Sequence, residues 1–283
     1  MVILPLIPFF LGYVRRDQSN TIPSYLFQVR VDTLFTNKSG TYDDKGNAGL
    51  AFNLKCLPHK VKNLKCHIPK TIFYSPSTDP VHMVDNNVFT PSSLQFSRIR
   101  FRMSFDSIGA ASYQILSDEK VKDEETLLDV YRFIGDHLSV GVNLGTKSFE
   151  FKTTELSSIG KCPTLYKISR DKAFNANNFQ LTSFIPNEKY KLVKGESFLI
   201  NKQRQVHECR PQYGFILGRR LWTDFIPTSN VIAELEESQT LITFSLHDFY
   251  TKSINKFELL NGQGHMIGYV QETINVGLVS IED

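Results

Sequence analysis

The sequence has little cysteine, little tryptophan and little net charge. Four cysteines and one tryptophan occur among 283 residues, and 32 basic against 29 acidic side chains leave a formal net charge of +3. So few cysteines favour a protein with reduced thiols over one built on a disulfide framework. Because the net charge is small, binding to an anionic partner would have to come from a local cluster of basic residues.

Long apolar runs are also absent. A membrane-spanning helix needs about 20 mainly apolar residues, and no run in the sequence is that long. The longest candidate is the N-terminal stretch MVILPLIPFFLGY, which is shorter and is interrupted by Pro5 and Pro8. A signal peptide carries its positive charge before the apolar run, whereas Arg15 and Arg16 follow this one. We expect residues 1–20 to form an extended segment that packs on the rest of the protein. We predict a cytoplasmic protein without a transmembrane segment, and association with the cytoskeleton or a membrane stays open.

Motifs of common enzymes are lacking as well. The sequence has no serine nucleophile elbow, no glycine-rich phosphate loop and no paired-carboxylate motif. Cys209 lies two residues from His207, but a nucleophile and its base must meet in space, and no acid that would orient the histidine is implied. We therefore predict a protein that is not an enzyme and needs no cofactor.

Aromatic residues and strand-like alternation are abundant. The 22 Phe and 11 Tyr favour β structure. Residues 25–35 alternate between apolar and polar side chains, which predicts a half-buried strand. The clearest alternation is LQFSRIRFRMSF at 94–105, where the apolar set is Ile99, Phe101, Met103 and Phe105. This pattern predicts a strand with one apolar face and one cationic face.

The cationic face of this predicted strand is the best candidate binding site. It carries Arg98, Arg100 and Arg102, which alternate and would stand about 6.6 Å apart. Guanidinium groups at this spacing could bind a phosphoinositide headgroup, nucleic-acid phosphates or an acidic peptide. The alternative is a solvated face paired with acidic neighbours such as Glu150 or residues 118–125.

Two stretches of the chain look alike, at 240–277 and 126–144. Each begins with a Thr-Leu pair after glutamates, continues through a strand-like segment and a polar turn, and ends in a glycine-containing strand. The spacing of Leu127, Tyr131 and Ile134 would also suit a helix, but the similarity between the two stretches favours a strand.

This repeat predicts a mainly β fold, with two antiparallel β-sandwich modules in tandem and few short helices. After the N-terminal segment, the first module would span residues 21–155 and the second residues 156–283. The boundary would lie in the polar stretch 153–178.

The order of these features resembles the "C-two" β-sandwich modules, named after conserved region two of protein kinase C. A weaker likeness is to the tandem modules of centriolar and ciliary scaffolds. The residues that carry the resemblance are Trp222, Leu241, Phe244, Leu246, Asp248, Ile267, Gly268, Val270 and Ile274, with Leu127, Val130, Val140, Gly141 and Leu144 in the first copy. The resemblance implies lipid, calcium or protein binding.

Calcium binding in that family needs several aspartates that converge from two loops, because the ion takes six to eight oxygen ligands. Here Asp43 and Asp44 belong to a different expected module from Asp248, and Tyr250 stands where a second aspartate is expected. We therefore expect binding to be independent of calcium.

Four residues with zinc-ligand side chains lie close together in the sequence CLPHKVKNLKCH. They are Cys56, His59, Cys66 and His67. Their spacing does not match the common zinc motifs, and we favour buried thiols with surface histidines over a metal site. The tripeptide Asn37-Lys38-Ser39 is a glycosylation acceptor only if the chain is secreted.

Together these features predict a non-catalytic interaction or targeting module. Its partner would be a protein or an anionic lipid, bound without calcium. The alternative is a nucleic-acid-binding or viral-type β-sandwich protein that uses the same arginines. A hydrolase with an unrecognised site is the second alternative.

Overall fold

The computed structural model describes residues 2–15, 21–40, 47–74, 99–117, 124–173, 177–211 and 231–282. In these ranges the chain is mainly β, with one α-helix, α1 (Glu124–His137), and short 3-10 helices at Leu144–Thr146, Glu188–Tyr190 and Val206–Glu208. No helix in these ranges is long and apolar enough to cross a membrane. The prediction of a mainly β fold is confirmed.

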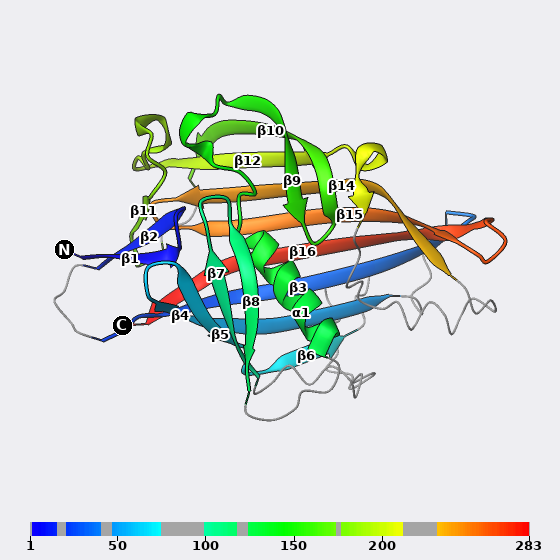
Figure 1. Cartoon of the computed structure of the whole chain (residues 1–283), viewed down its shortest axis with the longest axis horizontal. Helices are drawn as coiled ribbons and strands as arrows, with labels where there is room; N and C mark the ends of the chain where they lie inside the picture. Colours follow the sequence, from blue (N-terminus) through cyan, green and yellow to red (C-terminus); the bar gives the residue numbers. More distant parts are fainter. Residues whose placement is uncertain are drawn as a thin grey trace.

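Most strands belong to one large antiparallel sheet (Figure 1). Its order is β13 (Arg210–Pro211), β10 (Gly160–Lys172), β12 (Glu196–Arg204), β14 (Ile232–Ser245), β15 (Phe249–Leu260), β16 (Met266–Glu282), β3 (Ser24–Asn37), β4 (Ala48–His59), β5 (Asn63–His67), β7 (Arg100–Phe105) and β8 (Ala110–Leu116). In addition, β6 (Thr71–Tyr74) pairs with β4, and β9 (Glu150–Ser157) pairs with β10. Long strands with alternating buried and exposed residues, such as β3 and β15, give the sheet one buried face.

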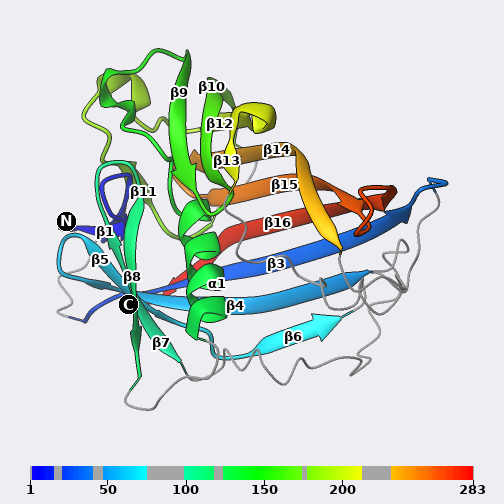
Figure 2. The same cartoon turned by 45° about the vertical axis from the view of Figure 1, so that its right-hand side comes forward.

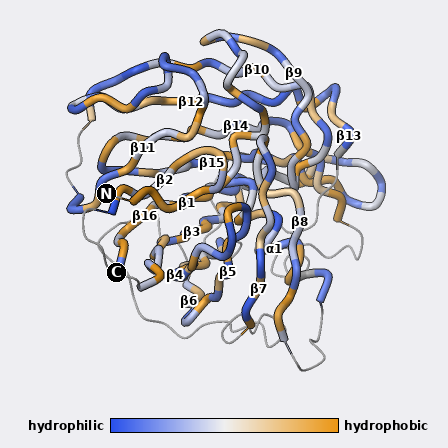
Figure 3. Tube along the Cα trace, turned by 60° about the vertical axis from the view of Figure 1, so that its left-hand side comes forward, coloured by the Kyte–Doolittle hydropathy of each residue, from blue (hydrophilic) through white to orange (hydrophobic). Residues whose placement is uncertain are grey.

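The apolar N-terminal stretch forms a hairpin of β1 (Val2–Ile7) and β2 (Leu11–Arg15). Strand β11 (Leu181–Ser183), from much later in the chain, pairs with β2, and the three strands make up a smaller sheet. Figure 3 shows the hydrophobic colouring along β1 and β2. Leu6, Ile7 and Leu11 belong to the main core, so this stretch contributes to the packing of the body.

Helix α1 replaces the strand that we expected at 127–134, and that prediction is wrong. The spacing of Leu127, Tyr131 and Ile134 follows the period of a helix, and all three are buried. Glu124 and Glu125 in the first turn interact favourably with the helix dipole. The Tyr131 ring stacks on Phe101 of β7, with ring centroids 3.7 Å apart. The burial of one helical stripe therefore decides the structure here, and the similarity to 240–277 does not.

The large sheet curves around α1. Figures 1 and 2 show α1 lying across the face formed by β3, β15 and β16, with β7–β8 at one end of the sheet and β9–β10 at the other turned over the same face. The main core fills the space between these elements, and a second apolar cluster lies further along the sheet at Phe35, Leu235, Phe257, Leu259 and Val270.

The expected division into two tandem modules has no counterpart in the strand pairing. The boundary between residues 155 and 156 falls inside β9. Strand β3 of the expected first module pairs with β16 of the expected second module from Ser24 to Asn37. The predicted structural repeat of 126–144 and 240–277 is also wrong, because the first stretch begins in α1 and the second begins in β14. The polar stretch at 153–178 contains most of the hairpin β9–β10 instead of a linker.

All four cysteines form disulfides, and the prediction of reduced thiols is wrong. Cys56 on β4 bonds to Cys66, which lies directly opposite on β5. Cys162 on β10 bonds to Cys209, 47 residues further along the chain. The expectation of a cytoplasmic location rested partly on reduced thiols and loses that support, because disulfides persist mainly in oxidising compartments.

Candidate functional site

Basic side chains from three neighbouring strands share the outer face of the sheet. In β5, Leu64 and Cys66 are buried, so Lys65 points outward, and His67 continues the alternation. In β7, Phe101 and Met103 are buried, and the arginines between them take the outer face. The alternation that the sequence showed at this strand therefore fixes the side on which Arg100 and Arg102 lie, as expected.

The strand register aligns these side chains in rows across the sheet. Lys65 lies directly opposite Arg102, and His67 lies directly opposite Arg100. On the other side of β5, Lys55 of β4 lies opposite His67. We call Lys55, Lys65, His67, Arg100 and Arg102 the cationic face. Directly opposed residues on adjacent strands have Cβ atoms about 5 Å apart, so the charges of the lysines and arginines repel one another unless an anion lies over them.

Among the described residues, carboxylates do little to neutralise the cationic face. Lys55 forms an ion pair of 2.8 Å with Glu282. Arg102 donates a hydrogen bond to Gln114 of β8, which carries no charge. Within the part of the chain that the structure describes, no carboxylate forms an ion pair with Lys65, Arg100 or Arg102.

The described members of the neutralising partners that the sequence suggested lie elsewhere. Glu150 pairs with Lys167 at 3.4 Å on the hairpin β9–β10. Residues 118–123 lie outside the described ranges, and Glu124 and Glu125 begin helix α1. Arg98 also lies outside the described ranges, so the structure places two of the three predicted arginines.

The two histidines near this face respond to the positive charge around them. Desolvation lowers the pKa of His67, and Arg100 and Lys55 lower it further. Desolvation also lowers the pKa of His59, with further contributions from Lys65, Lys60 and Arg102. Both imidazoles are therefore neutral at neutral pH, and an anion bound at the face would favour their protonated form.

The zinc alternative, which we did not favour, loses two of its four ligand side chains in this structure. Cys56 and Cys66 are joined in a disulfide, so neither offers a thiolate to a metal. His59 and His67 lie beside lysine and arginine side chains, which disfavour a cation. In the described ranges, no group of three or more His, Cys, Asp or Glu side chains could hold a metal ion.

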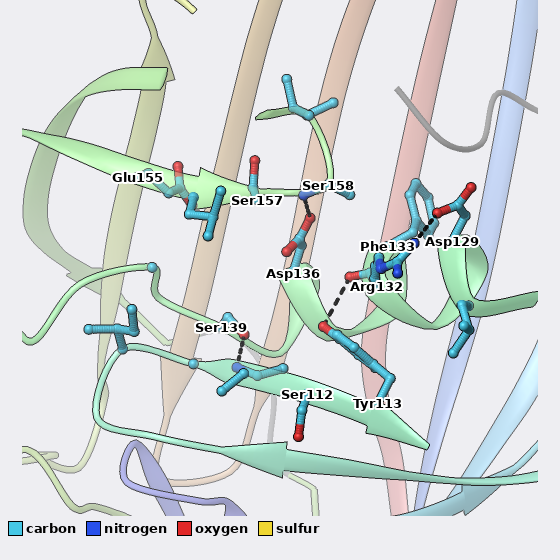
Figure 4. A pocket seen from close by; sticks show the side chains of 18 of the residues that line it. Ser112, Tyr113, Asp129, Arg132, Phe133, Asp136, Ser139, Glu155, Ser157 and Ser158 are labelled. Atoms are coloured by element: carbon cyan, nitrogen blue, oxygen red, sulfur yellow. Dashed lines mark hydrogen bonds and ion pairs between the residues drawn. The ribbon is translucent and has the colours of Figure 1, made fainter. Parts of the chain in front are cut away.

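A cavity of about 670 Å³ is the second feature of interest, and it lies between α1, β8 and the turn that joins β9 to β10. Figure 4 shows Asp136 of α1 pointing to the backbone of Ser158, and the hydroxyl of Tyr113 pointing to the carbonyl oxygen of Arg132. Phe133 and Phe257 give part of the wall an apolar surface. The cavity therefore combines acidic and aromatic walls.

Beside this cavity lies a buried ionic network. The Lys202 Nζ atom lies 2.7 Å from Glu155 Oε1, and an Arg204 terminal nitrogen lies 3.1 Å from Glu155 Oε2. Arg204 also donates to the hydroxyls of Ser238 and Thr240 at 3.0 and 3.1 Å. Burial alone would raise the pKa of Glu155, but Arg204 and Lys202 together lower it. The network ties β9 to β12 and β14 across the inner face of the sheet.

This network was not predicted from the sequence, although the sequence carries a signal for it. Lys202 and Arg204 continue the buried alternation that Phe198 and Ile200 begin in β12. A charged residue at a core position of a strand predicts a buried partner of opposite charge. The partner, Glu155, lies 47 residues away from Lys202 and has no such signal in its neighbours.

The burial of Asp136 predicts how the free energy of unfolding depends on pH. Burial raises the pKa of Asp136 to about 6 from an ordinary value of 3.8, against hydrogen bonds from Ser158. The folded state therefore holds the proton more tightly than the unfolded chain, and this contribution to stability is complete below pH 3.8 and is lost as the pH rises toward 6. The Asp136→Asn variant should avoid this loss, which amounts to about 3 kcal/mol.

Denaturant unfolding at several pH values would check this prediction. The neighbouring His137 has its pKa lowered to about 4, mainly by burial, and has the opposite effect on stability in the same window. The quantity to follow is therefore the difference in unfolding free energy between the variant and the unaltered protein, in which the His137 contribution cancels. A difference that stays constant from pH 4 to pH 7 would show that Asp136 is not perturbed.

Comparisons with known proteins bear on the fold. No protein-family model matches the chain, and no curated protein matches it. Among solved structures, the chain is similar to one described as "Lipid-protein interactions in lipovitellin", with a TM-score of 0.51 and 10% sequence identity. The match covers 92% of this chain and 25% of the lipovitellin chain. What the two chains share is the fold. The resemblance to the C-two family stays a prediction.

Proposed function

We propose that this chain is a non-catalytic binding module whose cationic face binds an anionic lipid surface without calcium. The observation that carries the proposal is the register that sets Lys65 directly opposite Arg102 on adjacent outward-facing strands, with Arg100 two residues before Arg102 on the same face of β7. This arrangement brings cations together although the whole chain has a net charge of only +3. Repulsion within the cluster costs free energy in the unbound protein, and an anionic partner would relieve that cost.

The shape of the site supports a surface as the partner. The cationic face lies on the outside of a sheet, so its side chains can meet several phosphate groups of a membrane at the same time. Alternate residues along a strand are about 6.6 Å apart, and neighbouring strands are about 4.8 Å apart. Arginine binds phosphate with two parallel hydrogen bonds, and Arg100 is exposed enough to do so.

The structural similarity to lipovitellin favours a lipid over other anions as the partner. The fold that this chain shares is that of a protein whose solved structure is described by its lipid–protein interactions. That description applies to lipovitellin and supports a lipid as the first partner to test here. Acidic protein segments and nucleic acids carry the same charge, and they enter the experiment as competing outcomes.

Vesicle flotation tests the proposal. A variant with Lys65→Gln, Arg100→Gln and Arg102→Gln should bind vesicles that contain an anionic phospholipid roughly a hundredfold more weakly than the unaltered chain. The reason is that each basic residue at an anionic surface contributes about 1 kcal/mol, and 1.4 kcal/mol is a factor of ten. Removing calcium with a chelator should leave the binding of the unaltered chain unchanged.

A matched control removes the same charge elsewhere. Lys161, Lys167 and Lys172 are exposed on β10, and changing them to glutamine should leave vesicle binding nearly unchanged. Equal binding by the two triple variants would overturn the proposal. If vesicles bind neither protein but RNA or DNA binds with a slope near one counterion per phosphate contacted, the nucleic-acid alternative replaces it.

A further inference from the structure

The only Asn-X-Ser/Thr tripeptide in the sequence, Asn37-Lys38-Ser39, forms an exposed turn at the end of β3. Ser39 donates its hydroxyl to the Asn37 side-chain oxygen at 2.7 Å and its backbone N–H to the same atom at 3.1 Å. The N–H of Gly40 donates to the Asn37 carbonyl at 2.9 Å, and Gly40 has a φ of 80°, which favours glycine. Lys38, Ser39 and Gly40 are exposed.

This turn lies beside the turn that joins β15 to β16. Asn37 is opposite Gly268 of β16, and Lys38 donates its N–H to the carbonyl of Ile267 at 3.1 Å. Figure 1 shows this tip of β3 at one end of the long axis, whereas β5 and β7 lie toward the other end. A large polar group on Asn37 would therefore extend away from the sheet and leave the cationic face uncovered.

The disulfides remove the objection that the sequence alone raised. Asn37 could be an acceptor only in a secreted chain, and reduced cysteines spoke against secretion. The structure pairs all four cysteines, in Cys56–Cys66 and Cys162–Cys209. Disulfides form in the same oxidising compartment of the secretory route in which asparagine is glycosylated. Two independent features, a disulfide set and an exposed acceptor turn, thus point to one compartment.

We propose that Asn37 carries an N-linked glycan. In the reaction, the side-chain amide nitrogen of Asn37 forms a C–N bond with the first sugar of a lipid-diphosphate-linked oligosaccharide. The bond between that sugar and the diphosphate breaks, the lipid diphosphate leaves with the electron pair, and the amide gives up one proton. No oxidant or reductant is needed. The proposal is independent of the lipid-binding function.

The test is expression of the full chain behind a secretory signal sequence in glycosylating cells. We expect one discrete mobility shift that a glycan-releasing amidase removes, with conversion of Asn37 to Asp in the peptide mass spectrum. Asn37→Gln and Ser39→Ala should each abolish the shift, and Ser39→Thr should keep it. Because the mass spectrum of the unaltered chain reports directly on Asn37, a variant that fails to fold does not obscure the result.

The chain offers an internal control at the neighbouring turn. The side-chain oxygen of Asn261 accepts hydrogen bonds from the N–H groups of Gln263 and His265, both at 2.9 Å, much as Asn37 accepts from Ser39. Gln263→Ser creates an acceptor at Asn261, so it should add a second shift, and it should restore one shift to Asn37→Gln. If the Gln263→Ser chain is glycosylated at Asn261 while Asn37 stays unmodified, the proposal is wrong.

Discussion

Replacing Glu155 with glutamine should destabilise the fold by about 3–5 kcal/mol, because two buried cations lose the carboxylate with which they form ion pairs. The side chains of Glu155, Lys202 and Arg204 are 3%, 1% and 4% exposed, so water cannot replace the lost carboxylate. The Lys202 ammonium keeps only the carbonyl oxygens of Ser139 and Val140, both at 3.4 Å. A loss of this size is a large part of the stability of an ordinary domain.

The measurement is the midpoint of urea unfolding, followed by circular dichroism. Glu208→Gln is the matched control, since Glu208 also faces a lysine, Lys152, at 3.8 Å but both side chains are at least half exposed. An exposed ion pair contributes at most about 1 kcal/mol, so this control should shift the midpoint little. Similar midpoints for the two variants would show that the buried network does not stabilise the fold.

Removing the disulfide Cys162–Cys209 should cost about 4 kcal/mol, and removing Cys56–Cys66 should cost about 3 kcal/mol. The difference follows from the chain entropy of the unfolded state, since the two bonds close segments with sequence separations of 47 and 10 residues. Paired Cys→Ala substitutions, one pair at a time, would be compared in chemical unfolding with and without a reductant.

A thiol titration of the denatured, unreduced protein gives a direct check on the same pairing. We expect no free thiol from the unaltered chain and two from it after selective reduction of one bond. Four free thiols in protein from an oxidising compartment would contradict the pairing. They would also remove one of the two supports for glycosylation at Asn37.

The parts of the fold that could be predicted are strands whose own residues alternate between apolar and polar side chains. The alternation at 25–35 and at 94–105 predicted strands that the structure describes as β3 and, from Arg100 to Phe105, as β7, and it placed Arg100 and Arg102 on the outer face. The choice between helix and strand at 127–134 could not be settled locally, because the spacing of Leu127, Tyr131 and Ile134 fits a helix while the similarity to 240–277 favoured a strand. Contact with Phe101 on a distant strand decides it in favour of the helix.

Pairing between distant segments could not be predicted either. Nothing near Lys65 indicates that Arg102 will lie opposite, yet this register builds the cationic face. The same holds for Cys162 and Cys209, whose separation does not distinguish a disulfide from two thiols. Contacts between distant segments, and not local pattern, thus account for the cationic face and for the disulfides that replace the expected free thiols.

The most direct test of lipid binding through the cationic face is a lysine footprint on vesicles. The full chain would be acetylated with and without vesicles that contain an anionic phospholipid, and the modification of Lys65 would be compared with that of Lys161 by mass spectrometry. Both lysines are exposed, and they lie on β5 and β10 at opposite ends of the strand order. We predict that vesicles protect Lys65 and leave Lys161 reactive. Equal reactivity of Lys65 with and without bound vesicles, or protection of Lys161 instead, would contradict the account.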